Sequence, residues 1–347
     1  MRKAFRRGLV VGKFSPLHLG HELLIHEALA QCEQLTLLSY SLPELSGCEA
    51  PRRQRWLQAR FADVPALVVT PAHIQAWRGE GKVLPDLPYN EAPDHQQRQF
   101  VAELCQVVLG STVDAVFTSE SYGDGFAAHL ARCFGHPVQH VCVDQARSVV
   151  PISGTRLRED PHGLKGFLAP PVYADFVERI VLLGGESTGK SSLAAALAQA
   201  LGSVHVAEFG REHWLAKDGA LEYHDLLHIG RTQVAHENAA AEGANRYLVC
   251  DTSPLTTLFY SGAMFGRAEP ELQRLAERPY AHTFLCADDF PFVQDGTRQD
   301  DSFRRRQQAW YRDELQRRGW AYHELRGCLA ERVGCVLGML QHRAPQA

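Results

Sequence analysis

The sequence lacks a long hydrophobic run, closely paired cysteines and an excess of charge of either sign. No stretch reaches the roughly 20 apolar residues of a membrane-spanning helix, and the apolar run near the N-terminus, LVV, is shorter than the roughly 7–15 residues of a signal peptide. The nine cysteines never form a Cys-x-x-Cys pair, which disfavours a zinc site or a disulfide framework. We therefore expect a cytoplasmic protein with reduced thiols and no membrane partner.

The charge balance limits the partners that the protein attracts. A formal net charge of −4 gives no general attraction to nucleic acid, so we expect no nucleic-acid partner and only local sites for anions. Hydrophobic residues make up 45% and charged residues 22% of the chain, as in ordinary globular proteins. A length of 347 residues favours two domains. The oligomeric state is left open, a homo-oligomer included.

Short apolar runs alternate with helical patterns along the whole chain. Such alternation predicts α/β domains with mainly parallel sheets. The pattern restarts after Pro170-Pro171, a pair that cannot continue a helix, so we predict two domains, 1–173 and 174–347. The expected strands are 8–12, 35–41, 66–70, 113–119 and 138–143 in the first domain, and 179–185, 203–208, 246–252, 282–287 and 320–325 in the second.

The stretch GKFSPLHLGH, residues 12–21, follows the first predicted strand and leads into a predicted helix. Ligands of open parallel sheets bind at the carboxyl ends of strands, where glycines allow close approach and a helix N-terminus attracts anions. Lys13, His18 and His21 therefore indicate a receptor for a triphosphate. No carboxylate or cysteine accompanies them to make a metal site. The alternative is that one of the histidines only caps the helix.

In this spacing the stretch resembles the signature of the HxGH nucleotidyltransferase superfamily, in the form found in nicotinamide mononucleotide adenylyltransferases. A second stretch, PISGTRLR at 151–158, resembles the second motif of these enzymes, Ile-Ser-Ser-Thr-x-x-Arg. It differs by the glycine at position 154, where a second serine is usual. The resemblance implies a Rossmann-like domain whose ATP-binding residues are Gly12, Lys13, Phe14, His18, Gly20, His21, Ser153, Thr155 and Arg158.

The same resemblance implies a reaction. An acceptor phosphate attacks the α-phosphorus of ATP and pyrophosphate leaves, with no covalent intermediate on the enzyme. Such a step depends on alignment and on neutralisation of charge. The implied catalytic residues are His18, His21, Lys13 and Arg158, and Mg²⁺ comes with ATP.

The stretch TSESYGDG, residues 118–125, resembles a loop of these adenylyltransferases that approaches the nucleotide. The resemblance places Ser119 and Glu120 in the ATP site, and the alternative is an ordinary polar turn. Members of the family stack an aromatic side chain on the nicotinamide ring. The candidates for that side chain here are Trp77, Tyr89 and Tyr122.

The stretch GGESTGKSS, residues 184–192, contains the complete phosphate-loop pattern G-x-x-x-x-G-K-S. It lies between a predicted strand and a predicted helix, which is the context that the pattern requires. We predict that Lys190 and the loop backbone hold the phosphates of ATP and that Ser191 binds Mg²⁺. The predicted ATP-binding residues are Gly184, Gly185, Glu186, Ser187, Thr188, Gly189, Lys190, Ser191 and Ser192.

Asp251 ends the apolar run YLVCD, where a Walker B acid would lie. We predict that its carboxylate is a second contact for Mg²⁺. The alternative is that Asp251 is the N-cap of the helix that begins at Pro254, and both roles are compatible.

Two further stretches favour a small-molecule kinase over a motor or switch protein. AEFGRE places Glu208, Arg211 and Glu212 beside the phosphate loop, where an acceptor hydroxyl would bind. Further along, Arg298 precedes a helix that starts with three arginines, the first of which is Arg304. We predict a lid that closes these arginines over the transferred phosphoryl group. The alternative is a solvated helix face.

An adenylyltransferase joined to a P-loop kinase resembles the NadR family, which pairs a nicotinamide mononucleotide adenylyltransferase domain with a ribosylnicotinamide kinase domain. The resemblance runs over nearly the whole chain. It implies that the C-terminal domain phosphorylates nicotinamide riboside, with Glu208 or Asp251 near the reacting hydroxyl, and that the N-terminal domain converts the mononucleotide and ATP to NAD. Some members carry an N-terminal helix-turn-helix repressor domain. We expect none here, because the first motif begins about ten residues from the start, and hence no DNA-binding role.

Two alternatives remain open at this point. One is a phosphopantetheine adenylyltransferase fused to a dephospho-coenzyme A kinase, although that family has Asp and Thr where this chain has Ser15 and His18. The other is a nucleotide-sensing regulator in which one site binds without turnover.

Overall fold

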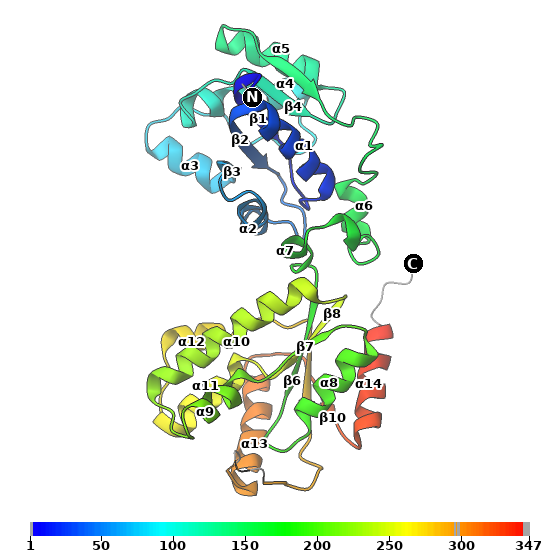
Figure 1. Ribbon diagram of the computed structural model, residues 1–347. Helices are drawn as coiled ribbons and strands as arrows, with labels where there is room; N and C mark the ends of the chain where they lie inside the picture. Colours follow the sequence, from blue (N-terminus) through cyan, green and yellow to red (C-terminus); the bar gives the residue numbers. More distant parts are fainter. Residues whose placement is uncertain (1–2, 295, 297–298, 343–347) are drawn as a thin grey trace. The chain divides into compact units, whose positions relative to one another are not determined.

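The computed structural model describes residues 3–294, 296 and 299–342. The chain divides into two compact units, Met1–Phe176 and Val177–Ala347 (Figure 1). The sequence placed the boundary after Tyr173, which is the last residue of the short helix α7 (Pro170–Tyr173). The chain then runs through three more residues of the first unit before it enters the first strand of the second.

The first unit is built on a five-stranded sheet in the order β3-β2-β1-β4-β5, in which all neighbouring strands are parallel. Each strand overlaps one of the five expected from the sequence, and the α/β prediction is confirmed. The strands are β1 (Phe5–Val11), β2 (Cys32–Tyr40), β3 (Ala66–Val69), β4 (Ala115–Thr118) and β5 (Gln139–Cys142). The helices are α1 (Leu19–Gln31), α2 (Ala50–Arg60), α3 (Pro71–Gly79), α4 (Asp94–Glu103), the π-helical turn η1 (Leu104–Val108), α5 (Gly123–Phe134), α6 (Gly154–Glu159), the 3₁₀ turn η2 (Lys165–Phe167) and α7.

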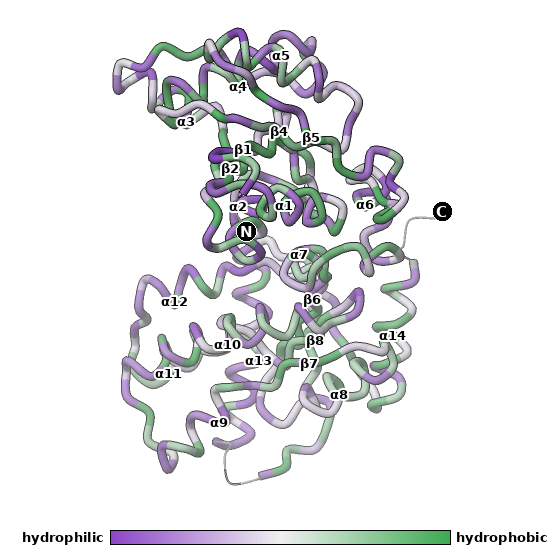
Figure 2. The backbone as a smooth tube through the Cα atoms, turned by 45° about the horizontal axis from the view of Figure 1, so that its top comes forward, coloured by the Kyte–Doolittle hydropathy of each residue, from purple (hydrophilic) through white to green (hydrophobic). Residues whose placement is uncertain are grey.

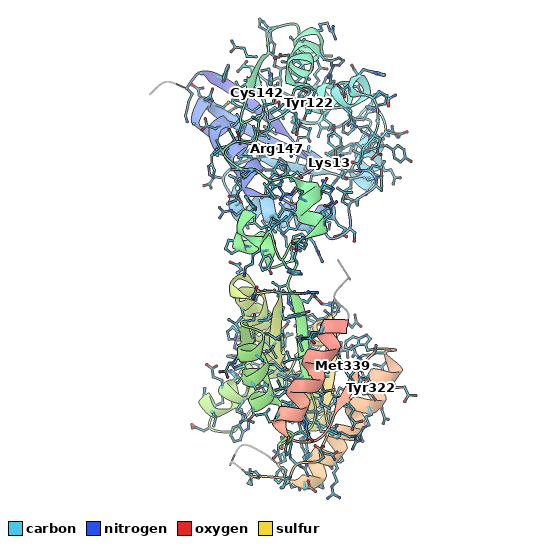
Figure 3. All side chains as sticks on the ribbon, turned by 90° about the vertical axis from the view of Figure 1, so that its right-hand side faces the viewer. Lys13, Tyr122, Cys142, Arg147, Tyr322 and Met339 are labelled. Carbon is cyan, nitrogen blue, oxygen red and sulfur yellow. The ribbon has the colours of Figure 1, made fainter. Side chains whose placement is uncertain are left out.

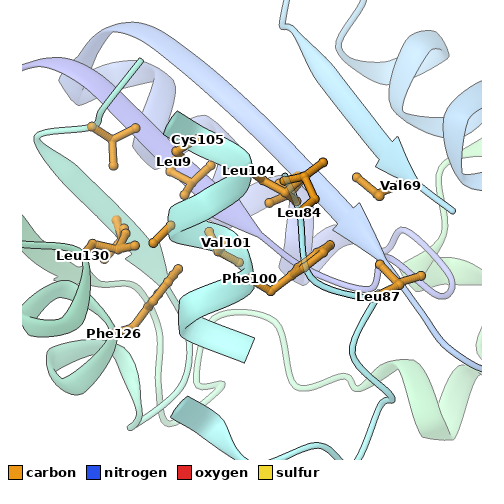
Figure 4. Packing of buried hydrophobic residues seen from close by; sticks show 14 of the residues in the cluster. Leu9, Val69, Leu84, Leu87, Phe100, Val101, Leu104, Cys105, Phe126 and Leu130 are labelled. Atoms are coloured by element: carbon orange, nitrogen blue, oxygen red, sulfur yellow. The ribbon is translucent and has the colours of Figure 1, made fainter. Parts of the chain in front are cut away.

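Alternation along the strands divides the apolar side chains between two faces of this sheet. On one face, Leu9 and Leu38 pack against Phe100 and Val101 of α4 and Phe126 of α5 (Figure 4). The apolar stripe of α1 packs against β1 and β2. With both faces covered, the strands read as nearly continuous apolar runs, which is why the sequence located them.

The second unit repeats the architecture with a parallel sheet in the order β10-β9-β6-β8-β7. The strands are β6 (Glu178–Leu183), β7 (Val204–Val206), β8 (Tyr247–Asp251), β9 (His282–Cys286) and β10 (His323–Leu325). The helices are α8 (Lys190–Ala200), α9 (Phe209–Ala216), α10 (Tyr223–Gly243), α11 (Pro254–Phe265), α12 (Pro270–Leu275), α13 (Asp301–Arg317) and α14 (Leu329–His342). Helices α8 and α14 cover one side of this sheet and α10 to α13 lie on the other (Figure 1).

Hydropathy follows this layering. Hydrophobic residues concentrate along strands such as β8, whereas much of α4 and α12 is hydrophilic (Figure 2). Within the described ranges, no helix has both the length and the apolar character that crossing a membrane requires. In both sheets the strand order reverses beside the first strand, β1 or β6. Ligands of such sheets bind in the crevice at this point, outside the carboxyl ends of the strands.

Candidate functional site

The loop between β1 and α1 lies at the carboxyl end of the central strand of the first sheet. Phe14 is fully buried within the loop and has a left-handed backbone, with φ of 48°. Its ring folds back over Gly12, where an added Cβ would come within 2.9 Å of a ring carbon. Glycine at position 12 therefore gives the aromatic side chain the room it needs under the loop.

The two histidines of this loop stack on each other at the start of α1. Their ring centroids are 3.7 Å apart, and the edge of Phe14 meets His21 at 5.1 Å. The Nδ1 atom of His18 accepts a hydrogen bond from the backbone N–H of His21 at 3.3 Å, so His18 is the N-cap of the helix. The cap that the sequence left as an alternative is thus present for His18, and the stacked ring of His21 lies beside it.

Both imidazoles are kept neutral by their surroundings. Burial, together with the positive charge of Arg147, lowers the pKa of His18 to about 4. Burial, the neighbouring His18 and Arg147 hold the pKa of His21 well below its ordinary value. At neutral pH the pair can therefore offer hydrogen bonds to a phosphate, while positive charge must come from other residues.

The second motif lies directly against the first. Arg158 donates from Nη1 to the carbonyl oxygen of Ser15 at 2.6 Å and from Nη2 to Thr155 Oγ1 at 3.2 Å. Ser153 caps α6 by accepting a hydrogen bond from the backbone of Arg156. An added Cβ at Gly154 would come within 2.9 Å of the carbonyl oxygen of Ser15. The glycine that departs from the family motif thus permits the close approach of the two loops.

Arg147 is a residue that sequence reasoning missed. It lies on the loop between β5 and α6 with φ of 51°, and its Nη2 forms an ion pair with Glu120 Oε1 at 3.0 Å. Its charge acts on both His18 and His21. Glu120 therefore pairs with an arginine whose charge acts on the two histidines, whereas Ser119 is half-buried in the same loop. No motif marks Arg147 in the sequence, since a lone arginine in a loop is ordinarily a solvated side chain.

A cavity of about 230 Å³ opens beside Gly12 and Lys13. Tyr122 lines it together with Tyr40, which the sequence did not indicate, and Lys13 and Tyr122 are labelled in Figure 3. Of the other aromatic candidates, Tyr89 is 65% exposed. Trp77 packs against the core and stacks on His73. Among the three candidates, the structure therefore brings only Tyr122 to the cavity.

Arg158 is close enough to Lys13 to affect the pKa of its ammonium group. Burial lowers the pKa of Lys13, the Glu91 carboxylate opposes this, and Arg158 adds to the lowering. Two cations placed near neutral imidazoles suit a polyanion such as a triphosphate.

The phosphate loop of the second unit joins β6 to α8. An added Cβ at Gly184 would come within 2.7 Å of the carbonyl oxygen of Cys286, and Gly189 has φ of 80°. The Nζ atom of Lys190 donates to the carbonyl oxygens of Gly184 and Gly185, each at 2.9 Å. The loop therefore curls around the lysine in the way that its sequence pattern predicts.

Two glutamines of α13 hold the backbone of the phosphate loop, and no sequence motif indicated them. Gln308 accepts from the backbone N–H of Gly185 at 2.9 Å and donates to the carbonyl oxygen of Cys286. Gln307 accepts from the N–H of Glu186 at 3.0 Å. Helix α13 is thus fastened to the loop by side chains.

A cavity of about 650 Å³ extends from the phosphate loop between α9, α10 and α11. Residues 186–192 of the loop line this cavity together with Glu208 and Arg211. All of these residues are among those that the sequence predicted as parts of the site. Its wall also contains Arg306, one of the three arginines predicted for the lid, and residues that no motif indicated, namely Trp214, Leu226, Ile229, Gln233, Tyr260, Met264 and Phe303. Sequence periodicity marks such side chains only as helix faces, so their convergence on one cavity depends on the tertiary fold.

Three carboxylates lie around the phosphate loop. Burial, assisted by the charges of Asp251 and Glu186, raises the pKa of Glu208 against the opposing effects of Lys190 and Arg211. Asp251 is 3% exposed and ends β8, level with Leu182 of β6. Its Oδ1 atom has no hydrogen-bond partner in the described part of the chain. An orphaned buried carboxylate oxygen next to a phosphate loop fits a ligand for a divalent cation or its water.

The alternative role for Asp251 is wrong. Ser253 is the N-cap of α11, and its hydroxyl accepts from the backbone N–H of Leu255 at 3.2 Å. The carboxylate of Asp251 is therefore available for another purpose.

The arginines of α13 divide among different roles. Arg304 is buried, donates to the carbonyl oxygen of Phe290 at 2.9 Å and pairs with Asp301, so it lies outside the cavity wall. Arg305 is exposed on the solvated side, and Arg306 lines the cavity. Glu212 is exposed and does not line the cavity either. Arg298 lies outside the described residues.

The fold and the phosphate loop define an α/β nucleotide-binding protein with a P-loop unit, and comparison with known proteins agrees. A family model described as an AAA domain matches residues 179–332. The trifunctional NAD biosynthesis/regulator protein NadR of Escherichia coli (strain K12) is 30% identical over 311 residues, which cover 84% of this chain and 71% of that protein. The chain belongs to the NadR family.

Two solved structures share the fold over the whole chain. A NadR protein in complex with NAD and AMP-PNP superposes with a TM-score of 0.70 at 18% identity, covering 99% of this chain and 98% of the other. A NadR protein in complex with NR superposes with a TM-score of 0.71 at 18% identity, covering 98% and 96%. These likenesses establish the arrangement of secondary structure.

Proposed function

We propose that the chain carries out two consecutive ATP-dependent steps of NAD biosynthesis. The second unit phosphorylates the 5′-hydroxyl of nicotinamide riboside, and the first unit joins the resulting nicotinamide mononucleotide to the adenylyl group of ATP, giving NAD and pyrophosphate. The observation that supports this most strongly is that each unit has its own candidate phosphate-binding loop at the carboxyl edge of its own sheet, beside its own cavity. The family supports it as well, because relatives are NAD biosynthesis proteins or bind NAD, AMP-PNP and NR.

The wall of the larger cavity suits a cationic aromatic ring. Trp214 and Tyr260 supply flat faces, and Glu186 and Glu208 supply negative charge. Aromatic faces and carboxylates together favour a pyridinium ring such as that of nicotinamide riboside. This arrangement favours nicotinamide riboside over 4′-phosphopantetheine, which carries no such ring.

In the kinase reaction, the riboside hydroxyl attacks the γ-phosphorus of ATP and ADP leaves. Glu208, whose pKa is raised by burial, accepts the proton of that hydroxyl. Lys190 holds the phosphates, and Arg211 and Arg306 face the cavity where negative charge develops. Positioned cations of this kind account for most of the acceleration of phosphoryl transfer.

Mg²⁺ would be held by the Ser191 hydroxyl and the Asp251 carboxylate, directly or through water. In the described part of the chain, no three His, Cys, Asp or Glu side chains group closely enough to hold a metal ion. The remaining ligands would therefore come from the nucleotide, and the ion would neutralise phosphate charge.

In the adenylyl transfer, a phosphate oxygen of the mononucleotide attacks the α-phosphorus of ATP and pyrophosphate leaves. His18 and His21 donate hydrogen bonds to the α-phosphate as neutral rings. Lys13, Arg147 and Arg158 supply the positive charge that the imidazoles lack. The nicotinamide end of the acceptor occupies the cavity lined by Tyr122.

Two single substitutions test the assignment of the two units. Lys190→Ala removes the cation in the phosphate loop, so formation of the mononucleotide from riboside should fall at least 100-fold, while NAD formation from supplied mononucleotide stays within twofold of wild type. His18→Ala should produce the opposite pattern. Steady-state rates of both reactions on both variants give the measurement. If His18→Ala leaves adenylyl transfer within a few-fold of wild type, the first site is misassigned.

A further inference from the structure

His140, on β5, joins two side chains from opposite ends of the loop that carries Glu120 and Tyr122. Its Nε2 lies 2.9 Å from Oγ1 of Thr118, the last residue of β4, and its Nδ1 lies 2.8 Å from Oδ1 of Asp124, in the first turn of α5. The imidazole is 9% exposed, and Thr118 is 4% exposed. The ring therefore joins the end of β4, at Thr118, to the first turn of α5, at Asp124.

The packing around this ring is tight. An added Cβ at Gly123 would come within 2.0 Å of Nε2 of His140, and the next two atoms of the ring would lie at 2.3 and 2.4 Å. Gly123 is itself buried. Because the imidazole occupies the space of a side chain at position 123, the position of the ring and the path of the loop depend on each other.

The bridge is linked to the first candidate site by short contacts as far as Arg147, and from Arg147 by the charge that acts on the two histidines. The Thr118 hydroxyl donates to the carbonyl oxygen of Glu120 at 3.1 Å, and its oxygen lies 3.4 Å from the backbone nitrogen of the same residue. The carboxylate of Glu120 holds Arg147, whose charge acts on His18 and His21. Tyr122 of the same loop lines the cavity beside Lys13.

Thr118 is not placed to act as a nucleophile, although the Thr118–His140–Asp124 contacts resemble a catalytic triad in their order. Its oxygen is buried and is already engaged by Glu120 and His140. The residues around it belong to the strand ends and the loop, so the contacts serve to hold the loop.

We propose that His140 is a positioning residue for adenylyl transfer. By tying Thr118 to Asp124, it sets the loop so that Glu120 presents Arg147 to the stacked histidines and Tyr122 faces the acceptor cavity. This inference rests on the adenylyl transfer proposed for the first unit.

The test compares His140→Ala with His140→Gln. His140→Ala loses the contacts with both Thr118 and Asp124. The amide of His140→Gln can still reach Thr118, so this variant should keep part of the wild-type activity. We expect His140→Ala to lower kcat/KM for ATP in adenylyl transfer about tenfold, mainly through a higher KM, with His140→Gln between it and wild type. Thr118→Val, which removes only the hydroxyl, should resemble His140→Ala. His95→Ala, on the exposed side of α4, is the matched control and should behave as wild type.

The kinase reaction of the same chain reports whether the rest of the protein is intact. It should stay within twofold of wild type in each variant. If His140→Ala lowers both activities, that variant is damaged as a whole, and the test then uses His140→Gln and Thr118→Val in its place. The proposal is overturned if these two variants keep the wild-type KM for ATP and the wild-type kcat, or if glutamine is no better than alanine.

Hydrogen exchange provides a readout that needs no activity. Backbone amides of residues 119–123 should exchange at least tenfold faster in His140→Ala than in wild type, while those of α8 in the second unit are unchanged. If the wild type forms no NAD but the loop exchanges faster in the variant, the proposed function fails together with the role of His140 in adenylyl transfer, whereas the finding that His140 holds the loop stands. Unchanged exchange in the loop would overturn the positioning role itself.

Discussion

At the scale of single residues, the two histidines of the first loop are neutral hydrogen-bonding groups in the adenylyl transfer that we propose. Their rings stack at 3.7 Å and are buried near Arg147. A pair of imidazolium ions at that separation would repel each other. The positive charge for a triphosphate therefore has to come from lysine and arginine, and the histidines supply directed hydrogen bonds.

The burial of His18 and the nearby charge of Arg147 predict a low pKa for its imidazole. Its pKa should be about 4, measured from the imidazole resonances by NMR. Arg147→Ala removes a nearby positive charge and should raise that pKa, while Arg156→Ala, on a neighbouring exposed arginine, should leave it unchanged. A His18 pKa near the ordinary value of about 6.5 would contradict the buried, neutral pair.

The same shift predicts how stability depends on pH. Because the pKa of His18 is lower in the folded protein than in the unfolded chain, the unfolded chain binds the proton first as the pH falls from about 6.5 toward about 4. The free energy of unfolding of the first unit should decrease over this window and gain no contribution from His18 above it. Denaturant titrations at several pH values check the slope, and Arg147→Ala should flatten it.

Gly154 is the residue at which the chain departs from the usual second motif. Because a Cβ there would lie 2.9 Å from the carbonyl oxygen of Ser15, Gly154→Ser should force the two loops apart. Overpacking of this kind typically costs about 1–3 kcal/mol, and adenylyl transfer should fall by at least tenfold. Gly166→Ser is a suitable control, since its Cβ would meet nothing within 4 Å. Wild-type activity in Gly154→Ser would mean that the glycine is not required for the contact.

At the scale of secondary structure, helix α9 is held in place by a residue of the next helix. Asp225 of α10 is 4% exposed and accepts hydrogen bonds from His213 Nε2 at 2.9 Å and Lys217 Nζ at 2.7 Å. Helix α9 carries Trp214, whose ring packs closely against Gly219. A Cβ added at Gly219 would lie 2.8 Å from a carbon of the indole ring. The carboxylate of Asp225 therefore helps to fix α9, which presents Trp214 to the larger cavity, and it also accepts the backbone N–H of Glu222 at the start of α10.

Asp225→Asn should weaken this attachment. The amide loses the charge that holds Lys217, so KM for the riboside should rise about fivefold or more, while KM for ATP, which contacts the phosphate loop, changes less than twofold. Initial rates at varied riboside and varied ATP measure the split. Asp218→Asn, on an exposed residue of the following turn, is the control. Equal changes in both KM values would contradict a role confined to α9.

Much of the element order could be predicted from sequence, and the reason is physical. Both sheets are parallel and covered on two faces, so β1 and β6 end in apolar runs, LVV and IVLL, from which the glycine-containing loops follow directly, and β8 is an apolar run that ends at Asp251. The other side chains of each site could not be predicted in this way. Arg147, Gln307 and Tyr40 reach the sites from segments distant in sequence, and their positions depend on how helices and loops pack. No local pattern marks such residues.

At the scale of the whole molecule, two units of similar architecture each contain a sheet, a core and a candidate phosphate site of their own. Every residue that we assign to one reaction lies in one unit. The two activities should therefore be separable by single substitutions, and in the reaction sequence that we propose the mononucleotide made by the second unit is the acceptor used by the first.

The most direct test of this account is a time course with purified protein, ATP, Mg²⁺ and nicotinamide riboside, followed by chromatography of the products. We expect nicotinamide mononucleotide to appear first and NAD to follow after a lag, with both absent when ATP is omitted. Mononucleotide without NAD would contradict the adenylyl transfer assigned to the first unit. Absence of both products would contradict the nicotinamide riboside pathway altogether, and 4′-phosphopantetheine would then be the next substrate to test.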